Sequence, residues 1–256
     1  MLETKDLEVG YMSHKGKISV SKDISFRISE GEMAAIVGVN GIGKSTLLRT
    51  LGRVQSKLAG SITVNEIAIE NYKSKDWAME LSVVLTDPLV SKNLTVQQLI
   101  SLGRHPYTNW IGTLSGKDAN KIQEAIKLVG LSKLSNKKCY ELSDGQLQKV
   151  MIARALAQDT QIILLDEPTT HLDLYHKVQI LKILQSIAHH TGKIVLYTTH
   201  EIDLAIQLCD KIMILEKREN FFGAPQELIK SERFSKLFPE DTIRFDPQSA
   251  SFKVNK

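Results

Sequence analysis

Short alternations of apolar and polar residues characterise the N-terminal part of the chain. Apolar side chains recur there at every second position, which is the period of a strand with one buried face. Glycines separate these runs, as expected for turns between neighbouring strands. The pattern therefore predicts an antiparallel β subdomain near the N-terminus. Its runs occupy residues 7–9, 18–20 and 24–28. Another short strand, opened by Gly60, is predicted at 61–64.

A second kind of run is apolar without interruption. Such runs are typical of strands covered on both faces, because a parallel sheet carries helices on each side. Stretches with helical spacing separate most of them. We therefore predict a largely parallel α/β sheet as the core of the protein. These runs occupy residues 33–37, 82–85, 162–165, 194–197 and 212–215.

The apolar period becomes helical between about residues 88 and 157. Thr95 is a candidate cap for a helix at 96–100, and residues 118–129 repeat apolar side chains at steps of three and four. An aromatic loop at 105–110 separates these two helices. The pattern predicts a helical subdomain inserted into the α/β sheet.

The end of the chain predicts one helix over residues 225–237, followed by an irregular polar end. No internal repeat or low-complexity linker divides the sequence, and 256 residues suffice for one substantial core. We therefore interpret residues 1–256 as a single domain. It comprises a helical subdomain at about 88–157 and a C-terminal extension at about 225–256.

Composition and charge limit the cellular compartments and the classes of binding partner that the sequence favours. A formal net charge of +4 is too small to predict nucleic-acid binding. Cys139 and Cys209 lie far apart without metal-type spacing, which favours inert thiols in a reducing compartment. The first residues are charged where a signal peptide needs an apolar stretch, and no segment approaches membrane-spanning length. We expect a cytoplasmic protein that reaches any membrane through a partner.

Candidate chemistry begins in a glycine-rich loop after the apolar run 33–37. Residues 38–46 read G-V-N-G-I-G-K-S-T and match the phosphate-binding pattern G-x-x-x-x-G-K-S. The glycines let backbone N–H groups approach a polyphosphate, and the following helix adds its positive end. Lys44 would lie between the β- and γ-phosphates, and the Ser45 hydroxyl would ligate Mg²⁺. A plain glycine-rich turn with a surface lysine is the less favoured interpretation.

Two carboxylates, Asp166 and Glu167, follow the apolar run 162–165. Ligands gather at the carboxyl ends of parallel strands, so this pair would face the phosphates held by the glycine loop. Asp166 suits holding Mg²⁺ directly or through water, and Glu167 suits polarising the water that attacks the γ-phosphate. The alternative is an acidic pair in solvent, which the preceding buried strand and the glycine loop disfavour.

The stretch 142–146 reads L-S-D-G-Q and precedes a helix running to about residue 157. With the glycine loop before it and the carboxylate pair after it, the chain resembles ATP-binding-cassette ATPases over about residues 2–225. The resemblance implies an α/β P-loop NTPase fold with a RecA-like, mostly parallel sheet. It further implies an N-terminal antiparallel β subdomain and a helical insertion, with ATP and Mg²⁺ as cofactors.

The resemblance also implies a homodimer. In this family the L-S-x-G-Q helix meets the γ-phosphate bound to the opposite subunit, so Ser143, Gly145 and Gln146 would act across the interface. Asp173, in a segment similar to the family's D-loop, would be a further contact between subunits. Two ATP molecules would then lie at the interface.

His200 and Tyr11 have less distinctive local patterns. His200 resembles the switch histidine that contacts the γ-phosphate, although a lone histidine after a strand is more often structural. Tyr11 resembles the aromatic residue that stacks on adenine, although an exposed tyrosine near a strand end is ordinary. The complete expected site has three groups of residues. Expected in catalysis are Glu167, His200 and Lys44; around the metal, Ser45, Asp166 and Thr86; in nucleotide binding, Tyr11, Gly38, Asn40, Gly41, Gly43, Lys44, Ser45, Thr46, Ser143, Gly145, Gln146 and Asp173.

Two positions depart from the pattern that the resemblance implies. Thr86 stands where a glutamine normally reaches Mg²⁺ and the attacking water, and Asp87 or an extra water could take over that contact. Asp144 stands where glycine is usual, next to a phosphate site that its charge would repel. We therefore expect Asp144 to point outward.

The sequence of the helical insertion indicates which kind of cassette ATPase the chain resembles. Residues 93–96 and 102–107, together with 167–173, are similar to ATPases of bacterial importers for ferric siderophores, haem and cobalamin. This resemblance implies transmembrane permease subunits as partners, with a short permease helix entering a groove beside Thr86. A substrate-binding protein would be an indirect partner. The chain would then lie peripherally on the cytoplasmic face of the cell membrane.

Two alternatives remain open from the residues. A soluble cassette ATPase acting on nucleic acid or the ribosome would usually carry paired cassettes, a long coiled coil or a strongly basic arm, and the chain has none of these. A binding module without hydrolysis is suggested by Thr86. The presence of Lys44, Asp166, Glu167 and His200 argues against that second alternative.

Overall fold

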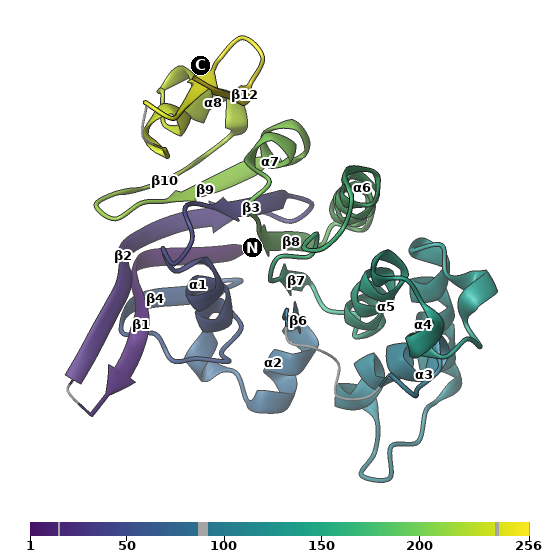
Figure 1. Ribbon diagram of the computed structural model, residues 1–256. Helices are drawn as coiled ribbons and strands as arrows, with labels where there is room; N and C mark the ends of the chain where they lie inside the picture. Colours follow the sequence, from purple (N-terminus) through teal and green to yellow (C-terminus); the bar gives the residue numbers. More distant parts are fainter. Residues whose placement is uncertain (15, 87–91, 239–240, 256) are drawn as a thin grey trace.

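The computed structural model describes residues 1–14, 16–86, 92–238 and 241–255 (Figure 1). Its core is a six-stranded sheet of order β10-β9-β3-β8-β7-β6. The strand pairs from β9 to β6 are parallel, and β10 is antiparallel to β9. This confirms the predicted mostly parallel sheet. The strands are β3 (Met33–Val37), β6 (Leu81–Val84), β7 (Ile162–Leu165), β8 (Ile194–Thr198), β9 (Lys211–Leu215) and β10 (Asn220–Gly223).

The side-chain alternation of these strands produces two hydrophobic cores, one on each face of the sheet. Ile163 and Val195 point into one core, whereas Leu164 and Leu196 point into the other. The first core includes the helices that follow β6 and β7, and the second includes the antiparallel sheet. Strands buried on both faces therefore need apolar residues at every position, which explains their unbroken apolar runs.

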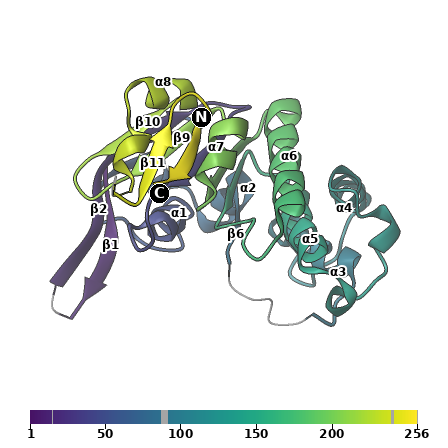
Figure 2. The ribbon, with the colours of Figure 1, turned by 45° about the horizontal axis from the view of Figure 1, so that its top comes forward.

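The predicted antiparallel β subdomain is present as a four-stranded sheet of order β2-β1-β4-β5. The two alternations predicted separately at 18–20 and 24–28 belong to one long strand, β2, because it follows β1 along its whole length. Together β1 and β2 form a hairpin that projects from the molecule (Figures 1 and 2). The strands are β1 (Leu2–Ser13), β2 (Gly16–Ile28), β4 (Ala59–Val64) and β5 (Ile67–Ala68).

The helices fall into those around the sheet and those of the helical subdomain. Around the sheet lie α1 (Lys44–Leu51), α2 (Ser74–Glu80), α6 (Leu174–Thr191), α7 (Ile202–Leu208) and α8 (Pro225–Lys230). The subdomain consists of α3 (Val96–Ser101), α4 (Gly116–Leu128) and α5 (Asp144–Ala157). Short 3₁₀ helices are η1 (Ile69–Asn71), η2 (Leu102–Tyr107), η3 (Ser132–Leu134), η4 (Cys139–Glu141) and η5 (Phe234–Lys236). None of the described helices combines the length and the apolar character needed to cross a bilayer.

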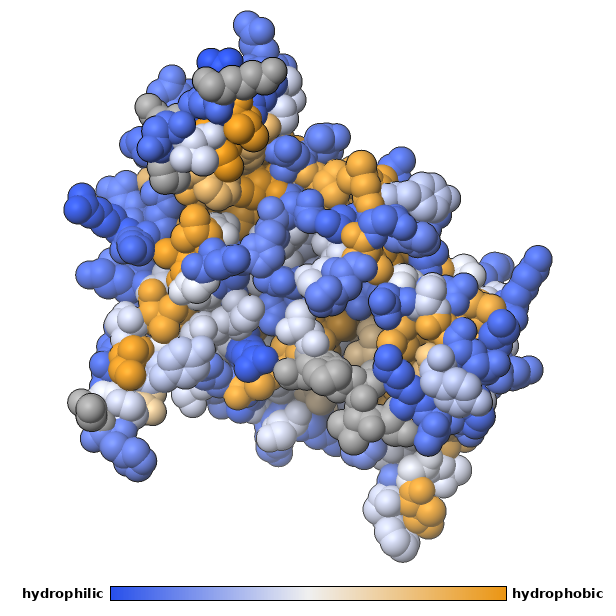
Figure 3. Space-filling model, in the orientation of Figure 1, coloured by the Kyte–Doolittle hydropathy of each residue, from blue (hydrophilic) through white to orange (hydrophobic). Residues whose placement is uncertain are grey.

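Inside the helical subdomain, a buried ion pair connects the 3₁₀ helix η2 to α4. Arg104 Nε lies 2.8 Å from Asp118 Oδ1, and Arg104 Nη1 donates to the Ala157 carbonyl at 2.7 Å. The Arg104 guanidinium also lies 3.8 Å from the ring centroid of Tyr107. The aromatic loop thus begins as the 3₁₀ helix η2 and packs through Tyr107. Trp110 is 94% exposed and Ile111 is also exposed. The projection at the lower right of Figure 3 is mostly pale and carries one hydrophobic patch in orange.

The C-terminal tail differs from its prediction. The expected helix at 225–237 is shorter: α8 ends at Lys230, and Glu232 has a left-handed φ of 57°, which a continuing helix does not permit. The end is also not irregular, because β11 (Ile243–Asp246) pairs with β12 (Ser251–Val254). Aromatic rings in edge-to-face contact hold this hairpin, with the ring centroids of Phe245 and Phe252 5.1 Å apart. It lies beside α7, far from the helical subdomain (Figures 1 and 2).

Candidate functional site

The glycine loop has the backbone geometry that its sequence predicts. It connects β3 to α1, and its glycines have positive φ values of 150° at Gly38 and 115° at Gly43. A side chain at Gly38 would place a Cβ 2.6 Å from the Leu215 carbonyl oxygen. One at Gly43 would place a Cβ 2.8 Å from Val20. Only glycine satisfies both the conformation and the space, so the loop can wrap closely around a ligand.

Lys44 begins α1 and turns back over the loop. Its ammonium donates to the Gly38 carbonyl at 2.8 Å and to the Val39 carbonyl at 3.3 Å. The pKa of Lys44 lies below its ordinary value because burial disfavours the charge, which Glu167 and Asp166 only partly offset. The loop therefore holds a largely buried ammonium that is suited to an anionic ligand.

Asp166 connects the glycine loop to the end of β7. Its Oδ1 accepts hydrogen bonds from the Ser45 hydroxyl at 2.9 Å and from the Thr198 hydroxyl at 2.7 Å. Thr198 is fully buried at the end of β8 and was not predicted as a site residue. The sequence feature that could have identified Thr198 is a polar residue directly after an apolar run. The structure thus brings Ser45 and Asp166, two of the expected metal residues, into direct contact.

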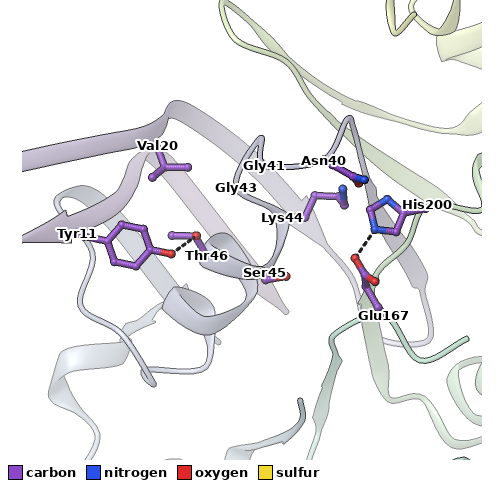
Figure 4. Close-up of a pocket in the computed structure, with 10 residues that line it drawn as sticks. All are labelled: Tyr11, Val20, Asn40, Gly41, Gly43, Lys44, Ser45, Thr46, Glu167 and His200. Atoms are coloured by element: carbon purple, nitrogen blue, oxygen red, sulfur yellow. Dashed lines mark hydrogen bonds and ion pairs between the residues drawn. The ribbon is translucent and has the colours of Figure 1, made fainter. Parts of the chain in front are cut away.

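Glu167 has a strained backbone, with a φ of 46°. Its N–H donates to Thr198 Oγ1 at 2.8 Å, and its Oε2 accepts from the Thr170 hydroxyl at 3.1 Å. Its Oε1 pairs with His200 Nε2 (Figure 4). The predicted catalytic carboxylate and the predicted switch histidine are therefore in direct contact, although they lie on different segments.

One cavity of about 450 Å³ is lined by Lys44, Ser45, Glu167 and His200 together (Figure 4). At its other end Tyr11 reaches it from β1, and the Tyr11 hydroxyl lies 2.8 Å from Thr46 Oγ1. Val20 of β2 also lines the cavity and was not predicted, because the sequence does not indicate which β2 residue faces the loop. The lining residues are Tyr11, Val20, Asn40, Gly41, Gly43, Lys44, Ser45, Thr46, Glu167 and His200.

The four residues expected to act across a dimer interface do not line this cavity. Ser143 caps α5, because its Oγ accepts from the Gln146 N–H at 3.3 Å while Gln146 Oε1 accepts from the Ser143 N–H at 3.2 Å. Gly145 is buried under His176, where an added Cβ would lie 3.2 Å from the ring. Asp173 caps α6 by accepting from the His176 N–H at 2.9 Å, and this bond lowers the pKa of its carboxyl. Within one chain these residues therefore stay apart from the glycine loop.

A second cavity of about 370 Å³ lies on the other side of the carboxylates. Thr86 lines it together with Asp166 and Glu167, so Thr86 is near the other expected metal residues. Asp144 lines it from α5 and is exposed. Asp87, the suggested substitute for the missing glutamine, lies outside the described residues. Other residues around this cavity are Leu85, Lys92, Leu147, Gln148, Met151, Thr170, His171 and Leu172.

The donor atoms around Ser45 and Asp166 fit a hard divalent cation. A hydroxyl and a carboxylate supply oxygen ligands only, and Mg²⁺ normally completes its shell with phosphate oxygens and water. Among the described residues, no group of three or more His, Cys, Asp or Glu side chains forms a metal-binding cluster. A site of the zinc or iron type is therefore not indicated by this part of the chain.

The chain is similar to several known proteins over most of its length. The family model described as ABC transporter matches residues 21–170. The petrobactin import ATP-binding protein FpuD of Bacillus anthracis is 34% identical over 96% of this chain and 89% of its own length. The iron(3+)-hydroxamate import ATP-binding protein FhuC of Bacillus subtilis is 35% identical over 84% of this chain and 79% of its own. An ATP-binding cassette solved as a dimer in a post-hydrolysis state with ADP and Pi has a TM-score of 0.73 and 28% identity, covering 86% of this chain and 98% of that one.

Proposed function

Because the chain belongs to the ABC transporter family and is an ATPase of that family, we propose that residues 1–256 form one cassette that powers a separate membrane permease during import. The observation that carries this proposal is that the glycine loop and the Glu167–His200 pair line one cavity, while Asp166 is hydrogen-bonded to Ser45 in its wall. Phosphate binding, metal binding and water activation would then occur at one place.

The cavity would bind ATP along its length. The N–H groups of the glycine loop and the Lys44 ammonium would hold the phosphates, and Tyr11, with Thr46 beside it, would contact the base end. Ser45 and Asp166 would hold Mg²⁺, with Thr86 nearby in the second cavity. When bound, the metal ion neutralises charge on the phosphate oxygens.

Glu167 is the proposed general base. Its carboxylate would accept a hydrogen bond from the attacking water while His200 and Thr170 fix its orientation. The water oxygen forms a bond to the γ-phosphorus as the bond to the β–γ bridging oxygen breaks. ATP and water become ADP and phosphate, and the water proton passes to Glu167 and then to solvent or phosphate. Lys44 would stabilise the charge on the transferring group.

A second copy of the chain would complete each site. Ser143, Gly145, Gln146 and Asp173 lie away from the ATP cavity of their own chain, yet Ser143 and Gln146 form a capped helix N-terminus suited to phosphate. The solved cassette with ADP and Pi is itself a dimer. We therefore propose a homodimer that encloses two ATP molecules.

The proposed cargo is a ferric chelate of the siderophore class. Two similar proteins are named for petrobactin import and for iron(3+)-hydroxamate import. In such a system the chain would lie peripherally at the cytoplasmic face of the membrane, bound to permease subunits that receive cargo from a substrate-binding protein. None of the reported relatives is named for nucleic acid, so the ribosomal or nucleic-acid alternative is not favoured.

The test is the Glu167→Gln variant of the full chain. The amide keeps the shape of the side chain but cannot accept a proton, so turnover of Mg-ATP should fall by at least about a hundredfold. ATP binding should persist, and ATP should shift the variant from monomer to dimer in light scattering. Glu124→Gln, which changes an exposed carboxylate on α4, is the matched control. Near-normal turnover in Glu167→Gln would remove Glu167 from the proposed role.

A further inference from the structure

The second cavity separates the catalytic carboxylates from the helical subdomain. Thr86, Asp166 and Glu167 form its wall on the side of the sheet, whereas Gln148 and Met151 of α5 form the opposite wall. The cavity has a volume of about 370 Å³, which is enough for several water molecules. Any polar group of α5 that faces this space can therefore act on the carboxylates, either directly or through water.

Gln148 supplies such a group. The glutamines at the two ends of α5 are engaged: Gln146 completes the cap with Ser143, and Gln158 Nε2 donates to the Ala78 carbonyl at 2.7 Å. The Gln148 carboxamide has no hydrogen bond within the described part of the chain, although it is partly buried in the cavity wall. A half-buried amide without a partner is costly unless the cavity supplies one.

Among the described residues, none of the hydrogen-bond or ion-pair partners of the two carboxylates lies on α5. Glu167 is contacted by His200 and Thr170, and Asp166 accepts from Ser45 and Thr198. Besides Thr170, the second cavity is lined by the short Thr86 hydroxyl from the segment after β6 and by Lys92. A carboxamide can donate to a carboxylate and accept from water at the same time, and it carries no charge that would compete with a cation.

We propose that Gln148 is a positioning residue for ATP hydrolysis. Its carboxamide reaches from α5 toward Glu167 and orients this carboxylate and its water, without taking up or releasing a proton. Turnover then depends on how closely the helical subdomain approaches the sheet. This inference rests on the proposed function, because it assigns Gln148 a part in the same reaction.

The first experiment separates kcat from KM in steady-state Mg-ATP hydrolysis by the full chain. Gln148→Ala should lower kcat about tenfold, with KM within about twofold, because the carboxamide orients the reacting groups without binding ATP. Gln148→Met keeps the length of the side chain and should lose the same factor, so it replaces Gln148→Ala if the alanine variant is unstable. Gln97→Ala, on the exposed face of α3, is the matched control and should keep the parental kcat.

The second experiment tests the position of the carboxamide. Thr86 lines the same cavity from the opposite wall, so Thr86→Gln introduces an amide into the same space. Adding Thr86→Gln to Gln148→Met should raise kcat at least threefold more than adding Thr86→Gln to the parent does. The parent is the necessary reference, because a glutamine at position 86 is itself expected to contact the attacking water. A merely structural defect at α5 would not be repaired by a change in the segment after β6, so a rescue specific to Gln148→Met distinguishes positioning from packing.

The outcomes separate the two proposals. If the parent and Gln97→Ala hydrolyse ATP and Gln148→Met retains a kcat within twofold of theirs, the role of Gln148 is wrong while the proposed function stands. A loss of kcat that Thr86→Gln does not repair equally overturns the positioning role. If the parent itself shows no ATP turnover, the proposed function fails, and the inference that depends on it fails as well.

Discussion

At the scale of single residues, the contact between Tyr11 and Thr46 lies at the proposed base end of the ATP cavity. Their hydroxyl oxygens lie 2.8 Å apart, and the Tyr11 ring is about half exposed. When the Tyr11 ring stacks on the base of ATP, nucleotide binding has to break this hydrogen bond. Tyr11→Phe keeps the ring and removes the bond, which is worth about 1 kcal/mol.

We therefore expect Tyr11→Phe to bind ATP about threefold to fivefold more tightly than the parent. Tyr11→Ala, which loses the ring, should bind more weakly than the parent. Isothermal titration with ATP in the absence of Mg²⁺ measures both. Tyr175→Phe removes an exposed hydroxyl outside the cavity and serves as the control. Weaker binding in Tyr11→Phe would show that the hydroxyl itself contacts the nucleotide.

The sequence predicted the residues of local motifs better than those that depend on neighbouring strands. Lys44, Ser45, Asp166 and Glu167 were recognisable because each follows an apolar run in a fixed pattern. Thr198 was not recognised, because its role arises from the pairing of β8 with β7. That pairing places Thr198, the last residue of β8, beside Asp166, which follows β7. The register of the two strands cannot be read from the sequence of either strand alone.

At the scale of elements, the pair of Arg104 and Asp118 fixes the 3₁₀ segment after α3 against α4. Their side chains are only 3% and 7% exposed. The Ser115 hydroxyl and N–H, followed by Arg104, lower the pKa of Asp118 to about 2. A lowered pKa means that the ionised carboxylate stabilises the folded chain above the unfolded pKa. This stabilisation is lost as the pH falls toward 2.

Asp118→Asn should therefore lower the free energy of unfolding at pH 7 by at least about 2 kcal/mol, because it leaves the Arg104 charge buried without its counterion. The difference from the parent should shrink as the pH is lowered from 4 toward 2. Urea unfolding at several pH values measures both effects. Glu124→Gln, which removes an exposed carboxylate from the same helix, should change stability by less than about 0.5 kcal/mol. A difference independent of pH would contradict the ionic explanation.

Helix caps and strands were predictable where the sequence pattern that indicates them lies within the element itself. Thr95 caps α3 as expected, because its Oγ1 accepts from the Gln98 N–H at 3.2 Å. The C-terminal hairpin was missed although residues 243–246 and 251–254 alternate in polarity. Each run is only four residues long, and two such strands are stable only when other parts of the chain cover them. Here Phe234, which precedes the hairpin, packs 5.2 Å from Phe245.

At the scale of the whole molecule, each chain carries two halves of the proposed site at separate places. Lys44 lies in the ATP cavity, whereas Ser143 lies at the start of α5, outside it. In a homodimer each site would combine Lys44 of one protomer with Ser143 of its partner. This arrangement predicts that two different inactive variants can restore each other.

Lys44→Ala should abolish most turnover by removing the phosphate-binding charge. Ser143→Asp should do so by placing a carboxylate against the γ-phosphate, while aspartate still caps α5. In mixed dimers, one site contains both changes and the other contains neither. Random mixing gives mixed molecules in about half of the dimers, so about a quarter of the parental turnover should return, provided that the two sites act independently. If Lys44 and Ser143 instead acted within one chain, mixing would restore nothing. ATPase assays of the variants, alone and as an equimolar mixture, decide between these arrangements.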